Sequence, residues 1–304
     1  MKIGAVIVTY NRINLLKECL DCVLNQSQEM DSVIVVNNNS DDGTKEYLDN
    51  LKDKRVKPYH SDTNLGGAGG FHKALSIATK EDFDYILIID DDAMIEKNYM
   101  KKIVKFAEKN EECNAFAGSV YTEGAVDTYH RRWLTLKVIF WERQVPRGMY
   151  NRPRKIDFAT FCGLVIRGDE LKRIGLPMEE YFIWYDDSEF CLRIKGGITL
   201  LPKARLNHKT VLNYKTGSIL GRISWKHYYG YRNRYDCAKR HLGSITTTAI
   251  LMEYFVFYLG SLLMCLNGDK REQGVYNLKM LRQVIRDCIE GNLGKNEDYL
   301  PQEG

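Results

Sequence analysis

Closely spaced cysteines are nearly absent from this sequence. Its eight cysteines are scattered, and only Cys19 and Cys22 have the short spacing seen in metal and redox motifs. A structural zinc site needs several such ligands, and no second close pair completes the set here. We therefore expect free thiols buried in a reducing cytosol rather than a zinc site or a disulfide framework.

Two widespread nucleotide-binding motifs are also missing. Residues 66–70 are rich in glycine, but they lack the G-x-G-x-x-G spacing after a strong strand, and no Lys-Ser or Lys-Thr pair follows as in a phosphate loop. We instead expect Gly69 and Gly70 to let the backbone approach a ligand, or to open a helix N-terminus toward a phosphate. A basic-then-apolar export segment is absent from the first residues, so we expect a cytoplasmic protein.

The composition excludes a disordered chain. Of the 304 residues, 44% are hydrophobic and 28% are charged, which suits one large α/β domain with an appendage or two modest domains. The net charge of +4 is small but uneven, because Asp236 is the only acid within 203–240. The cations of this basic stripe are Lys203, Arg205, Lys209, Lys215, Arg222, Lys226, Arg232, Arg234, Lys239 and Arg240. Such a stripe predicts an anionic partner: phosphate groups, acidic lipid or nucleic acid.

Short apolar segments alternate with helical patterns from the start of the chain. Residues 2–9, 32–37 and 85–89 form nearly continuous apolar runs, as in strands buried on both faces. Helical periodicity separates them, so the sequence predicts an α/β fold with a mostly parallel, doubly wound sheet and helices on both faces. Further strands are expected at 55–60, 114–121, 156–167 and 198–201, with an irregular, mobile loop over 122–154.

Polar residues follow three of these strands, at the edge where ligands bind in such sheets. They are residues 10–12 (Tyr-Asn-Arg), the turn-forming cluster 37–42 and the Asp triplet 90–92. Three adjacent carboxylates repel one another unless a cation or hydrogen-bond donors gather there, and hard oxygen ligands suit Mg²⁺ or Mn²⁺ bound to phosphate. One Asp as a helix cap is the alternative, but polar clusters at three strand ends exceed what capping needs.

A second carboxylate pair, Asp186-Asp187, follows an aromatic segment that contains Trp184 and Tyr185. Rings beside carboxylates form a desolvated, sugar-stacking wall where an Asp can work as a general base. First-turn acids favoured by a helix dipole are the alternative explanation. His208 lies just beyond the strand expected at 198–201, and such a histidine is either structural or a ligand.

The last third of the chain has a helical pattern. Residues 225–235 interleave aromatic and basic side chains, 245–266 is strongly apolar apart from Glu253, and a charged helix is expected over 271–290. The apolar segment is just long enough to span a bilayer, but Glu253 would be costly at its centre. We expect an interfacial or buried helix first and a membrane span second. Packing on the catalytic domain or a subunit contact is the alternative to membrane binding.

Taken together, these motifs resemble those of family-two inverting glycosyltransferases with the glycosyltransferase-A fold. More narrowly, they resemble bacterial galactofuranosyltransferases and rhamnosyltransferases that build cell-surface glycans. The resemblance covers roughly residues 1–213. The matching segments are 5–12 (AVIVTYNR), 35–44 (VVNNNSDDGT), 64–71 (NLGGAGGF), 90–92 (DDD), 184–189 (WYDDSE) and His208. Galactofuranosyl members place Trp directly before the Asp pair, whereas Tyr185 intervenes here, so the acceptor stays open.

The resemblance implies a metal-dependent hexosyltransferase with a UDP- or dTDP-linked donor. Asp90, Asp92 and His208 would hold the Mg²⁺ or Mn²⁺ ion, and Asp91 would face the nucleotide ribose. The donor-binding residues that it implies are Thr9, Tyr10, Asn11, Arg12, Asn38, Asn39, Asp41, Asn64, Gly69, Gly70, Asp90 and Asp91. Asp187, or in second place Asp186, would deprotonate the acceptor hydroxyl. Trp184 and Tyr185 would contact the acceptor.

The expected organisation is a glycosyltransferase-A catalytic domain over 1–215 and a helical region over 216–304 that is membrane-associated or oligomerising. The expected product is a growing, lipid-linked cell-surface glycan extended by galactofuranose or rhamnose. The enzyme would be peripheral at the inner face of the cytoplasmic membrane, without a nucleic-acid partner. A nucleotidyltransferase and a non-catalytic nucleotide-sugar or glycan-binding protein of the same fold are the alternatives, and a homo-oligomer is a further expectation.

Overall fold

Our computed structural model describes residues 1–209 and 224–300. The chain divides into two compact units. Unit 1 comprises residues 1–133, 143–179 and 187–211, and unit 2 comprises 134–142, 180–186 and 212–304. The domain boundary expected at 215/216 lies outside the described residues, as do Lys215 and Arg222 of the basic stripe.

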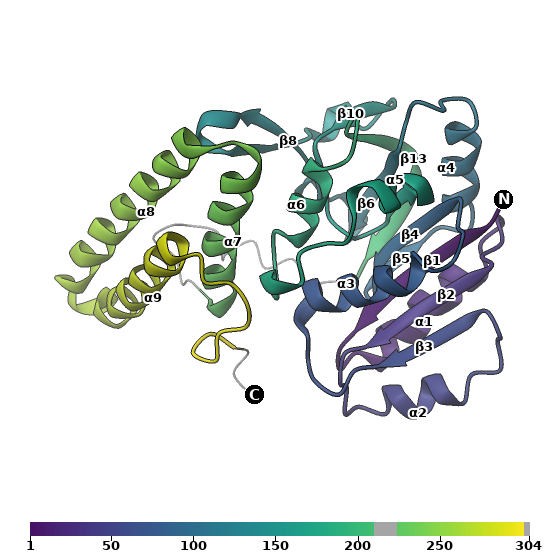
Figure 1. Ribbon diagram of the computed structural model, residues 1–304, viewed down its shortest axis with the longest axis horizontal. Helices are drawn as coiled ribbons and strands as arrows, with labels where there is room; N and C mark the ends of the chain where they lie inside the picture. Colours follow the sequence, from purple (N-terminus) through teal and green to yellow (C-terminus); the bar gives the residue numbers. More distant parts are fainter. Residues whose placement is uncertain (210–223, 301–304) are drawn as a thin grey trace. The chain divides into compact units, whose positions relative to one another are not determined.

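Unit 1 is built on a ten-stranded mixed sheet with the order β10-β13-β6-β12-β4-β1-β2-β3, to which β5 and β7 add at β13 and β6 (Figure 1). Its strands are β1 (Ile3–Thr9), β2 (Ser32–Asn37), β3 (Val56–His60), β4 (Tyr85–Asp90), β5 (Ala93–Ile95), β6 (Ala115–Thr122), β7 (Ala125–Val126), β10 (Arg154–Ile156), β12 (Leu164–Arg167) and β13 (Ile198–His208). Strands β3, β2, β1 and β4 are all parallel, and β12 runs antiparallel between β4 and β6. The predicted mostly parallel α/β sheet is confirmed.

Helices cover both faces of this sheet. Side chains of β1 alternate between the two faces of the sheet. Ile3 and Ile7 lie on the face where they pack with Leu16 of α1 (Ile13–Leu24), and α4 (Tyr99–Ala107) contributes to the same core. Helix α3 (Gly66–Ala78) packs on the opposite face, where a Cβ on Gly70 would lie 2.5 Å from Val8. The remaining helices are α2 (Thr44–Asp49), α5 (Gly168–Ile174) and α6 (Asp186–Leu192).

Three sequence predictions need correction. The single strand predicted over 156–167 is split, because the chain turns at Gly163 with φ +80° between β11 (Phe158–Ala159) and β12. The strand predicted at 198–201 continues to His208, since a register shift between Leu201 and Arg205 accommodates Pro202. The loop predicted over 122–154 is folded into β7, β8 (Arg131–Leu136), β9 (Trp141–Gln144) and short 3₁₀ turns, and the sheet β11-β8-β9 results.

Unit 2 consists mainly of three helices, α7 (Trp225–His241), α8 (Ser244–Cys265) and α9 (Arg271–Glu290), which pack against one another. The predicted C-terminal helical extension is confirmed. The segments 134–142 and 180–186 belong to this unit, which the sequence did not indicate. Among the described residues, α8 is the one helix long and apolar enough to cross a membrane, although a soluble core helix can share those properties.

Candidate active site

The carboxyl ends of β1, β2 and β4 lie side by side in unit 1. In the parallel register Thr9 pairs with Asn37, and Val8 pairs with Asp90. Residues that follow these strands therefore reach one edge of the sheet. The structure thus brings the Asp triplet together with the turns after the first two strands.

Asp91 is buried and bonds to the end of β1. It accepts hydrogen bonds from Oγ1 of Thr9 at 2.8 Å and from Nη1 of Arg12 at 3.2 Å. The same nitrogen of Arg12 lies 2.8 Å from Oδ2 of Asp92. Burial raises the pKa of Asp91 to about 6, although the charge of Arg12 opposes this rise. Arg12 is therefore the cation that supports two of the three carboxylates.

Asp92 also pairs with His208, at the end of β13. Its Oδ1 lies 3.2 Å from Nε2 of His208. Burial acts to raise the pKa of Asp92, but His208 and Arg12 hold it below its ordinary value, and Asp92 raises the pKa of His208 in turn. Oδ1 of Asp92 and Nδ1 of His208 are nevertheless buried without a well-aligned hydrogen-bond partner. Nδ1 of His208 is thus the ring nitrogen that stays available to a further ligand.

Asp90 is electrostatically linked to both carboxylate clusters. Burial and the neighbouring charges of Asp92, Asp91 and Asp187 raise its pKa to about 7, against a lowering effect of His208. Of the second carboxylate pair, Asp187 therefore acts on Asp90. A proton or a cation would relieve this repulsion.

Asp187, near the start of α6, is supported by polar neighbours in unit 1. Its Oδ1 accepts a hydrogen bond from Oγ of Ser188 at 3.0 Å, and Nη2 of Arg132 lies 3.2 Å from the same hydroxyl. Burial raises the pKa of Asp187, while the charge of Arg132 limits the rise. Such a carboxylate accepts a proton more readily than an exposed one.

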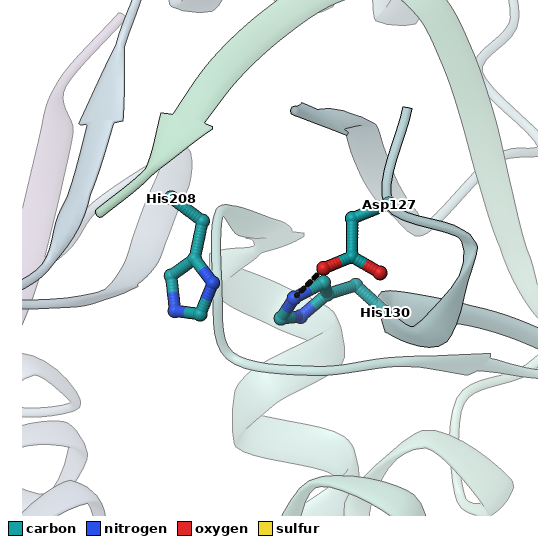
Figure 2. Close-up of side chains that lie close together, drawn as sticks. All are labelled: Asp127, His130 and His208. Carbon is teal, nitrogen blue, oxygen red and sulfur yellow. Dashed lines mark ion pairs between the residues drawn. The ribbon is translucent and has the colours of Figure 1, made fainter. Parts of the chain in front are cut away.

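Asp127, His130 and His208 form a cluster that the sequence analysis missed (Figure 2). One ligand atom from each lies within 4.8 Å of the others. Nε2 of His130 is 3.5 Å from Oδ2 of Asp127, its Nδ1 is 2.8 Å from Oγ1 of Thr160, and its ring meets the ring of His208 edge-on. Burial lowers the pKa of His130 to about 4, so the ring is neutral. The short Asp127-x-x-His130 spacing was the available signal, but it lies in the segment that we expected to be an irregular loop.

In unit 2, the aromatic segment before Asp186 has an unusual backbone. Phe182, Trp184 and Tyr185 all have positive φ, at 63°, 64° and 69°. Such angles are strained for bulky residues and tend to occur at functional sites. The fully buried Asn233 of α7 stabilises the segment: its Nδ2 donates to the carbonyls of Tyr181, Ile183 and Trp184 at 2.9, 3.1 and 2.9 Å.

The asparagines predicted at the donor site shape the turns beside the strands. Asn38 is buried, and its Nδ2 donates to Oδ1 of Asn64 and to the carbonyl of Gly66. Asn11 accepts a hydrogen bond from the backbone N–H of Asp41. Close packing against β1 and within α3 accounts for Gly70 and Gly69. Among all the residues predicted at the donor site, the exposed ones are Tyr10, Asn11, Arg12, Asn39 and Asp41.

Residues 5–175 match the family described as glycosyl transferase family 2. Galactofuranosyltransferase GlfT1 of Mycolicibacterium smegmatis is 25% identical over 244 residues, covering 76% of this chain and 80% of that protein. An uncharacterized glycosyltransferase of Rickettsia bellii is 33% identical over 110 residues, which are 36% of this chain and 15% of the relative. Glycosyltransferase GlyG of Streptococcus pneumoniae is likewise matched over 39% of its length.

Two solved structures share the fold. Residues 1–349 of S. aureus TarS, for which a complex with UDP-GlcNAc is also known, have a TM-score of 0.57 and 17% identity, covering 96% of this chain and 83% of that chain. GalNAc-T7 with UDP, GalNAc and Mn²⁺ has a TM-score of 0.63 and 16% identity, covering 96% of this chain and 58% of that chain. Identities this low support the fold alone.

Proposed function

Because this chain belongs to glycosyl transferase family 2, we propose that it is an inverting, metal-dependent hexosyltransferase that extends a lipid-linked cell-surface glycan. The observation that carries the proposal is the carboxylate cluster at the sheet edge where α/β folds bind ligands: Asp92 lies 3.2 Å from His208 there, and Asp187 acts electrostatically on Asp90. One carboxylate cluster would serve the donor diphosphate and the other the acceptor hydroxyl.

The donor would be a UDP- or dTDP-linked galactofuranose or rhamnose. The similarity to a galactofuranosyltransferase supports the sugar class, and the UDP-sugar complex of TarS supports a nucleoside diphosphate. Tyr10, Asn11, Asn39 and Asp41 are suited to the nucleotide because they are exposed at the turns after β1 and β2. Thr9, Asn38 and Asn64 would support the donor site indirectly. Thr9 holds Asp91 in place, and Asn38 and Asn64 stabilise the turns by the hydrogen bonds described above.

A divalent cation fits the residues present. Asp90, Asp92 and His208 offer two carboxylates and an imidazole. Nδ1 of His208 is buried without a hydrogen-bond partner, and the partner of Oδ1 of Asp92 is Nε2 of the same histidine. Mg²⁺ or Mn²⁺ bound there would neutralise charge on the leaving diphosphate. The Asp127-His130-His208 cluster is an alternative donor set, but Asp127 and His130 already have partners in Thr122 and Thr160. The Mn²⁺ in the GalNAc-T7 structure supports a metal in this fold.

Asp187 would act as the general base, with Asp186 in second place. It would take the proton from the acceptor hydroxyl while the oxygen attacks the anomeric carbon from the face opposite the diphosphate, which inverts the anomeric centre. The raised pKa of Asp187 suits this role, since its carboxylate gains basicity from burial. Trp184 and Tyr185, which directly precede the pair in the chain, would stack on the acceptor sugar.

A screen of nucleotide sugars tests the proposal. Released nucleoside diphosphate together with a glycosylated acceptor is the expected result. Pyrophosphate release would instead indicate a nucleotidyltransferase, and nucleotide binding without turnover would indicate a binding protein. Asp187→Asn should abolish transfer in this assay, whereas Asp186→Asn is the matched control that keeps most of it.

A lipid-linked acceptor would place the enzyme at the inner face of the cytoplasmic membrane. The apolar helix α8 supports this location. The interleaved aromatic and basic residues of α7 do not, because Tyr228, Tyr229 and Arg232 are buried and Arg234 is paired with Glu253.

A further inference from the structure

Helix α8 exposes an uncharged stripe along its whole length. The exposed residues follow helical spacing on one face, with the polar Thr248 between Ile245 and Met252. They are Ile245, Met252, Phe255, Val256, Leu259, Leu262, Leu263 and, at the C-cap, Leu266. At 1.5 Å per residue, the apolar part of the stripe from Met252 to Leu266 is about 20 Å long. Exposed apolar side chains gathered on one face in this way mark an interaction surface.

The only charged residue of α8 faces the rest of unit 2. Glu253 forms an ion pair with Arg234 of α7 at 2.9 Å, and Arg234 also donates to the carbonyl of Ile139. From the sequence, we expected Glu253 to oppose a membrane span, because an isolated carboxylate is costly at the bilayer centre. In the structure Glu253 is paired with Arg234, and the exposed stripe contains no charge.

A second exposed apolar element adjoins the start of α8. The 3₁₀ turn Lys137–Ile139 packs on α8, and Oγ1 of Thr246 donates to the carbonyl of Lys137 at 3.1 Å. Leu136, Val138, Ile139 and Trp141 are exposed on this β8–β9 hairpin. Trp is favoured at the boundary between lipid and water. The apolar surface of unit 2 therefore comes from two distant parts of the sequence.

Helix α9 adds exposed positive charge to the same unit. It packs along α8, and Gly274 allows the close approach, because a Cβ there would lie 2.9 Å from the backbone of Cys265. Lys279, Arg282 and Arg286 are exposed at helical spacing, and no ion pair is seen for them within the described part of the chain. The exposed acids of α9, Glu272 and Glu290, lie at its two ends.

We propose that the α8 stripe and the β8–β9 hairpin form one docking surface for an anionic lipid bilayer, with the α9 cations at its headgroups. An apolar stripe combined with cations and an interfacial Trp is the pattern of helices that lie in a membrane surface. A second copy of the chain fits less well, since its unpaired α9 cations would carry the same charge, whereas anionic headgroups neutralise them. The docking surface would bring the enzyme to the lipid-linked acceptor proposed above. The proposal rests on the proposed function in this respect only.

Vesicle flotation tests the proposal with the full chain. Phosphatidylcholine vesicles with increasing phosphatidylglycerol content should bind the wild type increasingly well. Leu263→Glu should weaken binding about tenfold, the loss expected from one buried apolar side chain. Lys279→Glu should weaken it at least about fivefold, because each cation near an anionic surface contributes about that factor. Met149→Glu, which changes an exposed apolar residue in unit 1, is the matched control and should bind as the wild type does.

Two further measurements decide between outcomes. Circular dichroism of each variant shows whether it folds, and a second variant, Leu259→Gln, replaces Leu263→Glu if that one does not. Light scattering without vesicles reports the oligomeric state: a wild-type dimer that Leu263→Glu dissociates, with no flotation, would overturn the proposal in favour of a subunit contact. Equal binding to neutral and anionic vesicles would overturn the role of the α9 cations. Flotation that persists while no nucleotide sugar is turned over would refute the proposed function and leave the docking surface standing.

Discussion

Replacing Asn233 should disable the aromatic segment of unit 2 without unfolding the protein. Its amide is the donor for three carbonyls of residues 181–184, and each buried carbonyl left without a donor costs about 1–3 kcal/mol. The positive φ values of Phe182, Trp184 and Tyr185 store about 1–3 kcal/mol each, which is at least as much. When the Asn233 amide is removed, the strained segment should therefore relax to another conformation. This relaxation avoids most of the loss in stability but changes the shape of the loop.

We expect Asn233→Ala to lower the free energy of unfolding by about 2 kcal/mol, or roughly 5 °C in Tm. Because Trp184 and Tyr185 move with the loop, the KM for acceptor should rise about tenfold or more, while the affinity for nucleotide stays the same. Asn233→Asp keeps the hydrogen bond from Arg232 but donates to no carbonyl. The acceptor KM of this variant should therefore rise as much as that of Asn233→Ala, although the protein keeps part of the stability that Asn233→Ala loses.

The matched control is Asn277→Ala. Asn277 is a second fully buried asparagine of unit 2, on α9, with Gln273 as its neighbour. It accepts its hydrogen bond from Gln273 on the same helix, so its replacement should change stability but not the acceptor KM. Equal acceptor KM values for the Asn233 variants and the wild type would refute the positioning role, as would an equal rise in the Asn277 variant.

Three other changes test the site directly. Asp187→Asn should leave donor binding intact in a nucleotide titration while transfer falls by several orders of magnitude; a variant that transfers near the wild-type rate would exclude Asp187 as the base. Gly230→Ala should raise the acceptor KM, because its Cβ would lie 2.8 Å from the ring of Trp184, and an unchanged KM would argue against that ring as an acceptor contact. Asp92→Ala should abolish activity, and excess EDTA should do the same to the wild type; full turnover in EDTA would contradict metal dependence.

Much of the catalytic fold could be predicted because its signals are local. The apolar runs before Asn37 and Asp90 are buried strands, and their ends meet because parallel strands share a direction. The prediction failed where a long-range contact overrides local preference. Pro202 indicates the end of a strand, yet pairing with β6 on both sides of a bulge carries β13 on to His208. That extension matters, since it brings His208 within 3.2 Å of Asp92.

The supporting residues of the site were harder to find than the carboxylates. Asp127 and His130 lie close to His208 only in the folded chain, and a sequence pattern does not give the distance between residues so far apart in the sequence. Asn233 lies about 50 residues beyond the aromatic segment that it holds. A single buried amide has no periodicity by which it could be recognised in the sequence. Side chains that satisfy distant backbone groups become visible only in the folded chain.

The charge balance of the site explains why a cation and the donor belong together. In the proposed reaction the carboxylates of Asp90, Asp91 and Asp92 would lie near an anionic diphosphate, and Arg12 is the cation that pairs with two of them. Without a cation, burial and mutual repulsion raise the pKa of Asp90 to about 7, so part of the protein carries a proton there at neutral pH. Mn²⁺ binding should therefore release a proton, because a carboxylate ligand must be ionised. Calorimetry at pH 7 in two buffers of different ionisation enthalpy measures this release. Mn²⁺ binding with no proton release would place the ion away from Asp90.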